Sequence, residues 1–152
     1  MKTNRVVIVQ CRLSSTRLPG KALKMLGEKP VLAWVLQSMH RVNADRYFVA
    51  TDFDSFEKIE PVCKKYGFEC FKGDLNDVLK RFCDLLKTIP CKTVIRATAD
   101  NPFLFYEAAE ESVKDFEERN SSGMKCDYLT WTGLPHGSGV EIFNADSLLK
   151  AM

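Results

Sequence analysis

The amino-acid sequence predicts an α/β fold, a three-layer sandwich in which helices cover both faces of a mostly parallel central sheet. Two observations lead to this prediction. Short apolar runs alternate along the chain with longer segments whose apolar residues recur at helical spacing. The runs are rich in β-branched residues and lack polar alternation, which is typical of strands that are buried on both faces. Residues 6–9, with the sequence VVIV, are the clearest example.

The expected elements follow in order along the chain. Strands are expected at residues 6–9, 46–51, 68–71, 93–97, 127–131 and 140–143. Helices are expected from Pro30 to about residue 39, from about 56 to 66, from about 76 to 89, from 105 to 118, and from about 145 onward. Proline suits the first position of a helix, and Gly67 ends the second helix. Asp74 or Asn76 is expected to cap the third helix, and Asn144 or Asp146 the last.

Length and composition bound the possible functions. A chain of 152 residues predicts one domain with a sizeable core. Hydrophobic residues make up 45% and charged residues 28%, which is ordinary for a globular protein. A net charge of +2 gives no reason to expect nucleic acid or an anionic membrane as a partner. No apolar run approaches the roughly 18 residues of a membrane span, and the N-terminal stretch does not resemble a signal peptide.

The cysteines indicate a reducing compartment. The six cysteines show no C-x-x-C pair and no histidine spacing typical of zinc sites, and several fall within apolar patterns. We therefore expect free thiols in a cytoplasmic protein.

The most informative stretch is the loop after the first strand, residues 10–21, with the sequence QCRLSSTRLPGK. Residues 1–27 hold six lysines and arginines and no acidic residue. Guanidinium forks, lysine and backbone N–H groups suit phosphate oxygens, and Gly20 allows close backbone approach. The stretch therefore predicts a phosphate cradle, and the alternative is a solvated basic loop. The side chains available to it are Arg12, Ser14, Ser15, Thr16, Arg17 and Lys21.

A second stretch, residues 96–102 with the sequence RATADNP, follows the fourth expected strand. Asp100 is the only acidic residue between Cys91 and Tyr106. The carboxyl ends of parallel strands share one edge of a sheet, so this carboxylate should lie opposite the cationic loop. There it could hold Mg²⁺ on a nucleoside triphosphate. The alternative is an ordinary turn or helix-capping aspartate.

Both stretches carry a resemblance to a known family. QCRLSSTRLPGK resembles the signature Q-A-R-x-x-S-T-R-L-P-G-K of the sugar cytidylyltransferases, with Cys11 in place of the usual alanine. These enzymes make CMP-activated acidic sugars and include the CMP-acylneuraminate and CMP-Kdo synthetases. RATADNP is similar to T-A-D-C-P of the spore-coat polysaccharide (SpsF-type) branch and to the metal-binding Q-G-D-E-P of the Kdo enzymes. The resemblance implies a nucleotide-diphospho-sugar transferase fold of Rossmann-like type.

Two weaker stretches extend the resemblance. Residues 73–81, GDLNDVLKR, look like G-D-x-x-D-V-L-x-R, in which Asp77 and Arg81 are spaced to pair on one helix face. The N-terminus of this helix could receive substrate anions, and the alternative is a capped surface helix with an ion pair. Residues 134–143, LPHGSGVEIF, are similar to P-x-G-L-D-V-E-x-F, so Glu141 matches the last acid and Gly139 replaces an aspartate. Family members continue beyond this point, so the chain is expected to be a single nucleotidyltransferase-like domain, residues 1–152, without the family's C-terminal elements.

The resemblance implies an enzyme that transfers CMP from CTP to the anomeric hydroxyl of an acidic sugar, with Mg²⁺ as cofactor, acting as a monomer or homodimer. The implied catalytic residues are Arg12, Lys21 and Asp100, and the implied metal ligands are Asp100 and Glu141. The implied substrate-binding residues are Gln10, Arg12, Ser14, Ser15, Thr16, Arg17, Gly20, Lys21, Thr98, Asp77, Arg81 and His136.

Two alternatives remain open. A homologue that binds a nucleotide or a partner without turnover is favoured by Gly139 and by the early end of the resemblance. A glycosyltransferase of the same fold is the other, because residues 52–54 have the D-x-D spacing of a metal motif.

Overall fold

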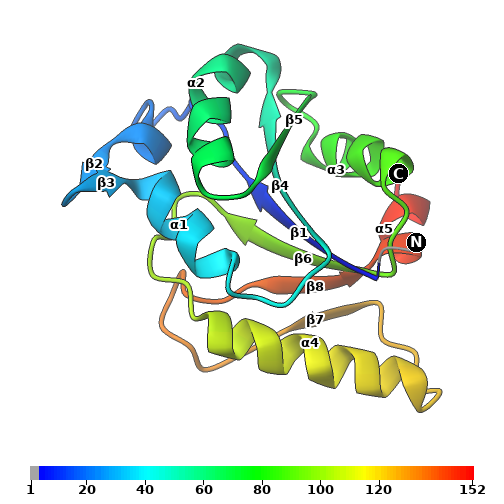
Figure 1. Cartoon of the computed structure of the whole chain (residues 1–152). Coiled ribbons are helices and arrows are strands. Elements are labelled where there is room, and N and C mark those ends of the chain that lie inside the picture. Colours follow the sequence, from blue (N-terminus) through cyan, green and yellow to red (C-terminus); the bar gives the residue numbers. More distant parts are fainter. Residues whose placement is uncertain (1–3) are drawn as a thin grey trace.

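A six-stranded sheet with helices on both faces forms the centre of the protein in the computed structural model, which describes residues 4–152 (Figure 1). The strand order is β5-β4-β1-β6-β8-β7. The four parallel strands are β1 (Arg5–Gln10), β4 (Arg46–Asp52), β5 (Glu69–Gly73) and β6 (Thr93–Thr98). β8 (Glu141–Asn144) runs antiparallel to β6, and β7 (Tyr128–Thr130) antiparallel to β8. The predicted α/β class with a mostly parallel sheet is confirmed.

The helices divide between the two faces of the sheet. α1 (Val31–Met39), α2 (Phe53–Lys65) and α4 (Tyr106–Ser121) pack in one hydrophobic cluster, and α3 (Val78–Thr88) and α5 (Ala145–Lys150) in the other. A 3-10 turn, η1 (Lys21–Leu23), and a small ribbon of β2 (Met25–Leu26) and β3 (Lys29–Pro30) link β1 to α1. The expected helices are all present, with ends that differ by a few residues.

β1 is the most deeply buried element. Val6, Val7, Ile8 and Val9 are completely buried, and β1 lies between β4 and β6. Val7 and Val9 face the cluster of α1, α2 and α4, whereas Val6 and Ile8 face α3. An apolar run without polar alternation is therefore explained by burial on both sides.

Acidic and amide side chains begin several helices at the carboxyl ends of strands. Asp52 caps α2, Asp77 caps α3 and Asn144 caps α5, each by accepting a backbone N–H three residues later. The expectation of Asp74 or Asn76 as the cap of α3 is wrong. Asp74 instead accepts the amides of Asn76 and Asp77 in the preceding turn, and α3 begins at Val78, directly after its cap Asp77.

The parallel strands place their following segments at one edge of the sheet, here called the carboxyl edge. β1 and β6 both run toward the side on which the β2–β3 ribbon projects (Figure 1). The loop of residues 11–20 and the segment of residues 99–105 follow these two strands. Within residues 4–152, no helix is long and apolar enough to span a membrane.

Candidate functional site

A cleft of about 250 Å³ lies at the carboxyl edge, between the loop after β1 and the segment after β6. β1 and β6 are adjacent and in register, with Gln10 opposite Thr98, and the Ala99 amide donates to the Gln10 carbonyl at 3.0 Å. This pairing brings the two predicted motifs together although they are far apart in the sequence. The cleft is lined by Gln10, Cys11, Arg12, Ser15, Lys21, Ala22, Thr98, Ala99 and Asp100.

The loop of residues 11–20 is closed by its own backbone. The Leu13 carbonyl accepts the amide of Ser15 at 3.0 Å and that of Gly20 at 2.8 Å. Gly20 has φ of 70°, in the left-handed region that favours glycine, and it immediately precedes η1. The turn at Gly20 thus brings Lys21 back toward the strand end, and both Arg12 and Lys21 line the cleft.

The charged groups of the cleft are not neutralised by neighbours. Arg12 and Asp100 are exposed and Lys21 is half-buried. Among residues 4–152, none of these three side chains forms an ion pair. Two cations and one carboxylate therefore face the cleft with their charges available to a ligand.

Cys11 forms the apolar floor of the cleft. Its side chain is 2% exposed, and burial raises the pKa of the thiol to about 12. The residue is therefore a neutral thiol that fills space.

Arg96 is a residue of this region that the sequence analysis did not assign. Its Nη2 donates to Gln10 Oε1 at 2.6 Å, and its Nη1 lies 2.9 Å from Glu141 Oε1. Arg96 thereby orients a side chain that lines the cleft. The available signal was its position two residues before Thr98, because alternate residues of a strand share a face. Glu141, proposed from the sequence as a metal ligand, is paired with Arg96 and does not line the cleft.

The predicted ion pair between Asp77 and Arg81 is wrong. Arg81 is completely buried, and its Nε and Nη2 donate to the carbonyls of Asp74 and Leu75 at 2.7 and 3.0 Å. Burial lowers its pKa, and the negative charge of Asp52 partly counteracts this. Asp77 uses its carboxylate to cap α3. The i,i+4 spacing was correct, but the apolar environment of the helix favoured carbonyl partners for the guanidinium.

The predicted site residues outside the cleft occupy exposed or neighbouring positions. Ser14, Thr16 and Arg17 are exposed on the loop, and Gly20 shapes its turn. His136 is exposed in the segment before β8. That segment nevertheless packs beside the cleft: the Phe105 amide donates to the Ser138 carbonyl at 3.1 Å, and a Cβ on Gly137 would lie 2.7 Å from Asn101 Oδ1.

The cleft offers a single carboxylate for a metal ion. Within residues 4–152, no group of three or more histidine, cysteine or acidic side chains could hold a metal. The D-x-D spacing of residues 52–54 does not provide such a group. Asp52 is 2% exposed and accepts two hydrogen bonds from Ser55 as the cap of α2. The structure therefore gives no support to the glycosyltransferase alternative.

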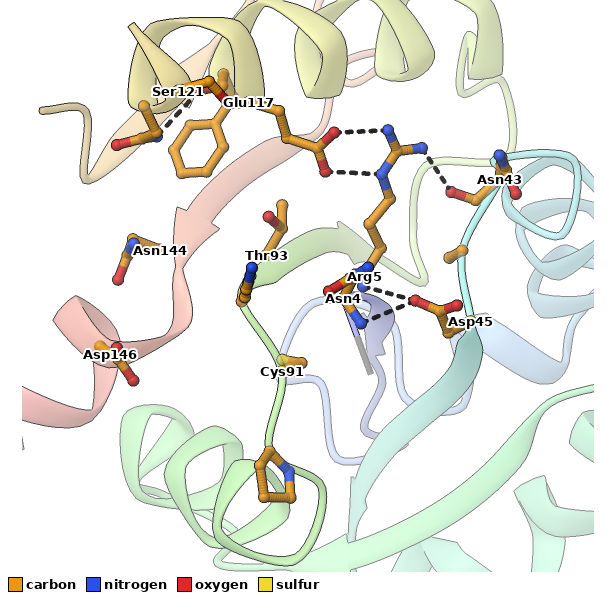
Figure 2. A pocket seen from close by; sticks show the side chains of 15 residues that line it. Asn4, Arg5, Asn43, Asp45, Cys91, Thr93, Glu117, Ser121, Asn144 and Asp146 are labelled. Atoms are coloured by element: carbon orange, nitrogen blue, oxygen red, sulfur yellow. Dashed lines mark hydrogen bonds and ion pairs between the residues drawn. The ribbon is translucent and has the colours of Figure 1, made fainter. Parts of the chain in front are cut away.

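A larger cavity, of about 970 Å³, lies at the opposite edge of the sheet (Figure 2). There Arg5 Nε and Nη2 each donate to the Glu117 carboxylate at 2.7 Å, and Asp45 accepts the amides of Asn4 and Arg5 at 2.9 Å (Figure 2). Arg5 and Glu117 thus satisfy each other, and backbone amides satisfy Asp45. We select the smaller cleft as the candidate site because its charges are unpaired and it lies beyond the carboxyl ends of the parallel strands.

The fold and the cleft define a nucleotidyltransferase-like protein, and comparisons with known proteins place it more closely. The model of the family described as cytidylyltransferase matches residues 6–152, so the chain belongs to this family. The sequence is 31% identical over 148 residues to the spore coat polysaccharide biosynthesis protein SpsF of Bacillus subtilis, covering 93% of this chain and 60% of that protein. It is 31% identical over 117 residues to 3-deoxy-manno-octulosonate cytidylyltransferase of Marinobacter nauticus, covering 74% of this chain and 44% of that protein.

Solved structures agree with this placement. A cytidylyltransferase from Leptospira borgpetersenii superposes with a TM-score of 0.88 at 27% identity, covering 97% of this chain and 63% of that one. A CMP:2-keto-3-deoxy-manno-octonic acid synthetase complexed with CTP superposes with a TM-score of 0.75 at 15% identity, covering 97% of this chain and 77% of that one, and shows the shared fold. The chain thus spans about 60% of the SpsF protein that it matches.

Proposed function

We propose that the protein is a cytidylyltransferase that transfers CMP from CTP to the anomeric hydroxyl of an acidic sugar, for cell-surface or spore-coat polysaccharide biosynthesis. The observation that carries this proposal is the convergence of Arg12, Lys21 and Asp100 on one cleft. The names of the similar proteins support it, since they include a polysaccharide biosynthesis protein and a cytidylyltransferase of a keto-sugar acid.

Arg12 and Lys21 would bind the triphosphate. A guanidinium donates two hydrogen bonds to phosphate oxygens, and the lysine adds a mobile point charge. Ser15 lines the same wall and supplies a hydroxyl. A cleft of about 250 Å³ is smaller than the roughly 300–1,000 Å³ of drug-sized pockets, so it suits the phosphates and not a whole nucleotide.

Asp100 is the residue that would hold Mg²⁺. A single carboxylate, with phosphate oxygens and water completing the octahedron, is a common donor set for this ion. The donor chemistry of the cleft therefore fits a magnesium–nucleotide complex better than a free metal ion. When bound, Mg²⁺ would supply neutralisation of phosphate charge.

In the proposed reaction the anomeric oxygen of the sugar forms a bond to the α-phosphorus of CTP. The bond from the α-phosphorus to its bridging oxygen breaks, and pyrophosphate leaves with the electron pair. The hydroxyl proton passes to solvent or to a base. The contribution of Arg12 and Lys21 is positioning and charge stabilisation, which are the main sources of catalysis in phosphoryl-type transfer.

A second candidate is nucleotide binding without turnover. The observation that favours it is the pairing of Glu141 with Arg96 at 2.9 Å, which leaves one carboxylate in the cleft. Gly139, in place of the family's aspartate, points the same way.

One assay separates the two candidates. The 152-residue protein is incubated with CTP, Mg²⁺ and a panel of keto-sugar acids, and pyrophosphate release is measured beside CTP binding by calorimetry. Acceptor-dependent release supports the enzyme. Binding of CTP without release, with every acceptor, supports the second candidate. Absence of CTP binding contradicts both, and UTP in a parallel series tests the choice of base.

A further inference from the structure

A buried hydrogen-bond chain connects the start of α2 to the cationic loop. We propose that Ser55, supported by Asp52, is a positioning residue that fixes this loop through the Leu13 amide. The inference rests on the proposed function, because the phosphates of the nucleotide are what the positioned loop would bind.

Three hydrogen bonds make up this connection, one between Leu13 and Ser55 and two between Ser55 and Asp52. The Leu13 amide donates to Ser55 Oγ at 3.1 Å, and the Ser55 hydroxyl in turn donates to Asp52 Oδ2 at 2.8 Å. The Ser55 amide donates to Asp52 Oδ1 at 2.9 Å. The direction of the bonds follows from the backbone: both amides can only donate, so the Ser55 oxygen accepts from Leu13 and its hydroxyl proton points to the Asp52 carboxylate.

Both anchoring residues are shielded from water. Asp52 is 2% and Ser55 3% exposed, so water hardly competes for the two hydrogen bonds between them, and the bond to Leu13 is part-buried. The guanidinium of Arg81, itself completely buried, lies near enough to Asp52 for the charge of Asp52 to act on the pKa of Arg81. The anchor is thus a stable feature of the folded protein before any ligand binds.

Leu13 is the point at which this anchor controls the loop. Its amide is held by Ser55, while its carbonyl accepts the amides of Ser15 and Gly20 at 3.0 and 2.8 Å. One residue therefore sets the positions of both ends of the turn. Arg12 immediately precedes Leu13 and Lys21 immediately follows Gly20, so the two cations depend on the same anchor.

Helix capping alone does not explain the Ser55 hydroxyl. The cap of α2 requires the Ser55 amide and Asp52 Oδ1, and an alanine at position 55 would keep both. Among the residues that the structure describes, the hydroxyl is the one group of this cap that bonds the loop. A variant without it should therefore retain the helix and lose the fixed geometry of the loop.

The test compares Ser55→Ala with Ser112→Ala. Ser112, in α4, is 1% exposed and donates to the Ala108 carbonyl at 2.7 Å, so each change removes one buried hydroxyl and only one of them touches the loop. Melting temperature and binding of CTP, inorganic triphosphate and cytidine are measured for both variants and for the unaltered protein. We expect Ser55→Ala to bind CTP and triphosphate about fivefold to tenfold more weakly than Ser112→Ala, with cytidine affinity unchanged.

The outcomes distinguish this inference from the proposed function. If the triphosphate affinities of the two variants lie within twofold of each other, the positioning role of Ser55 is wrong. It is also wrong if Ser55→Ala loses affinity for triphosphate and cytidine equally, because that result indicates a general loss of structure at the binding site. Arg12→Ala serves as the reference for the function itself. If the unaltered protein binds CTP and Arg12→Ala weakens it while Ser55→Ala does not, the positioning role alone is wrong. If the unaltered protein does not bind CTP, the proposed function fails as well.

Discussion

Arg96 and Glu141 face each other across the antiparallel pair of β6 and β8, with 2.9 Å between Nη1 and Oε1. Their side chains are 25% and 35% exposed, so solvent partly screens the pair. Because Arg96 also donates to Gln10, which lines the cleft, the pair helps to orient a side chain of the cleft wall. Asp100, which has no such partner among the described residues, is the carboxylate that remains for a metal ion.

Asp100→Asn should abolish the enhancement of CTP binding by Mg²⁺, because the amide keeps the shape and removes the charge that the ion needs. Binding without metal should persist through Arg12 and Lys21. Glu141→Gln is the matched control and should retain the magnesium enhancement, with a loss of stability below about 1 kcal/mol. Calorimetry with and without Mg²⁺ measures the first effect, and denaturant unfolding the second. If Mg²⁺ still enhances CTP binding fully in Asp100→Asn, Asp100 does not bind the metal ion and is only a turn residue.

Arg12, Arg17 and Lys21 should contribute differently to CTP binding. Arg12 and Lys21 line the cleft, whereas Arg17 is exposed outside its lining. Because charge-assisted hydrogen bonds contribute roughly 1.5–3 kcal/mol, Arg12→Ala and Lys21→Ala should each weaken CTP binding about tenfold or more. Arg17→Ala should have the smaller effect, and all three variants should melt at nearly the unaltered temperature in the absence of ligand. Equal losses for all three would mean that the loop closes over the nucleotide.

Cys11 should resist alkylation in the folded protein. Its thiol pKa is raised to about 12 by burial, so at pH 8 only about one molecule in ten thousand carries the reactive thiolate. Mass spectrometry after brief alkylation should find Cys11 unmodified in the native state and modified in urea. Denatured, unreduced protein should show six free thiols, since the structure has all six cysteines unpaired. Rapid native labelling of Cys11 would show that the loop opens.

Gly73→Ala should destabilise the protein by about 1–3 kcal/mol, the usual cost of overpacking. An added Cβ would lie 2.8 Å from Arg81 Cγ, and Arg81 is held by two backbone carbonyls and cannot move aside. Gly139→Ala is the control, because its Cβ would meet only Leu134 at an ordinary 3.6 Å. Urea unfolding of both variants measures the difference. Equal stability would indicate that α3 shifts to accommodate the methyl group.

Periodicity and strand-end chemistry were sufficient to predict most of the fold. The uninterrupted apolar run of β1 indicated a central strand, and parallel strands place their following loops at one edge. The meeting of Arg12, Lys21 and Asp100 could therefore be predicted from sequence. The family was predicted from the residue-by-residue resemblance of the motifs, because composition alone does not indicate a family.

The side-chain partners could not be predicted in the same way. Arg81 has a carboxylate at i−4 and nevertheless bonds two carbonyls, because its burial depends on how α3 packs beside β5. Glu141 pairs with Arg96 because the register of β6 and β8 places the two residues opposite each other. No local sequence pattern specifies that register. The Leu13–Ser55 contact joins the loop after β1 to the first turn of α2, and nothing in either stretch alone points to the other.

The central position of β1 also constrains the order in which the chain can fold during synthesis. β1 leaves the ribosome before the other strands of this sheet, but one of its two neighbours, β6, pairs Thr93 with Arg5 and so is made much later. Until then the apolar strand has only β4 beside it, and the edge that β6 will occupy is unprotected. Pairing across such long separations slows folding. The nascent chain should therefore be most prone to aggregation, and most dependent on chaperones, in the interval between the emergence of β4 and that of β6.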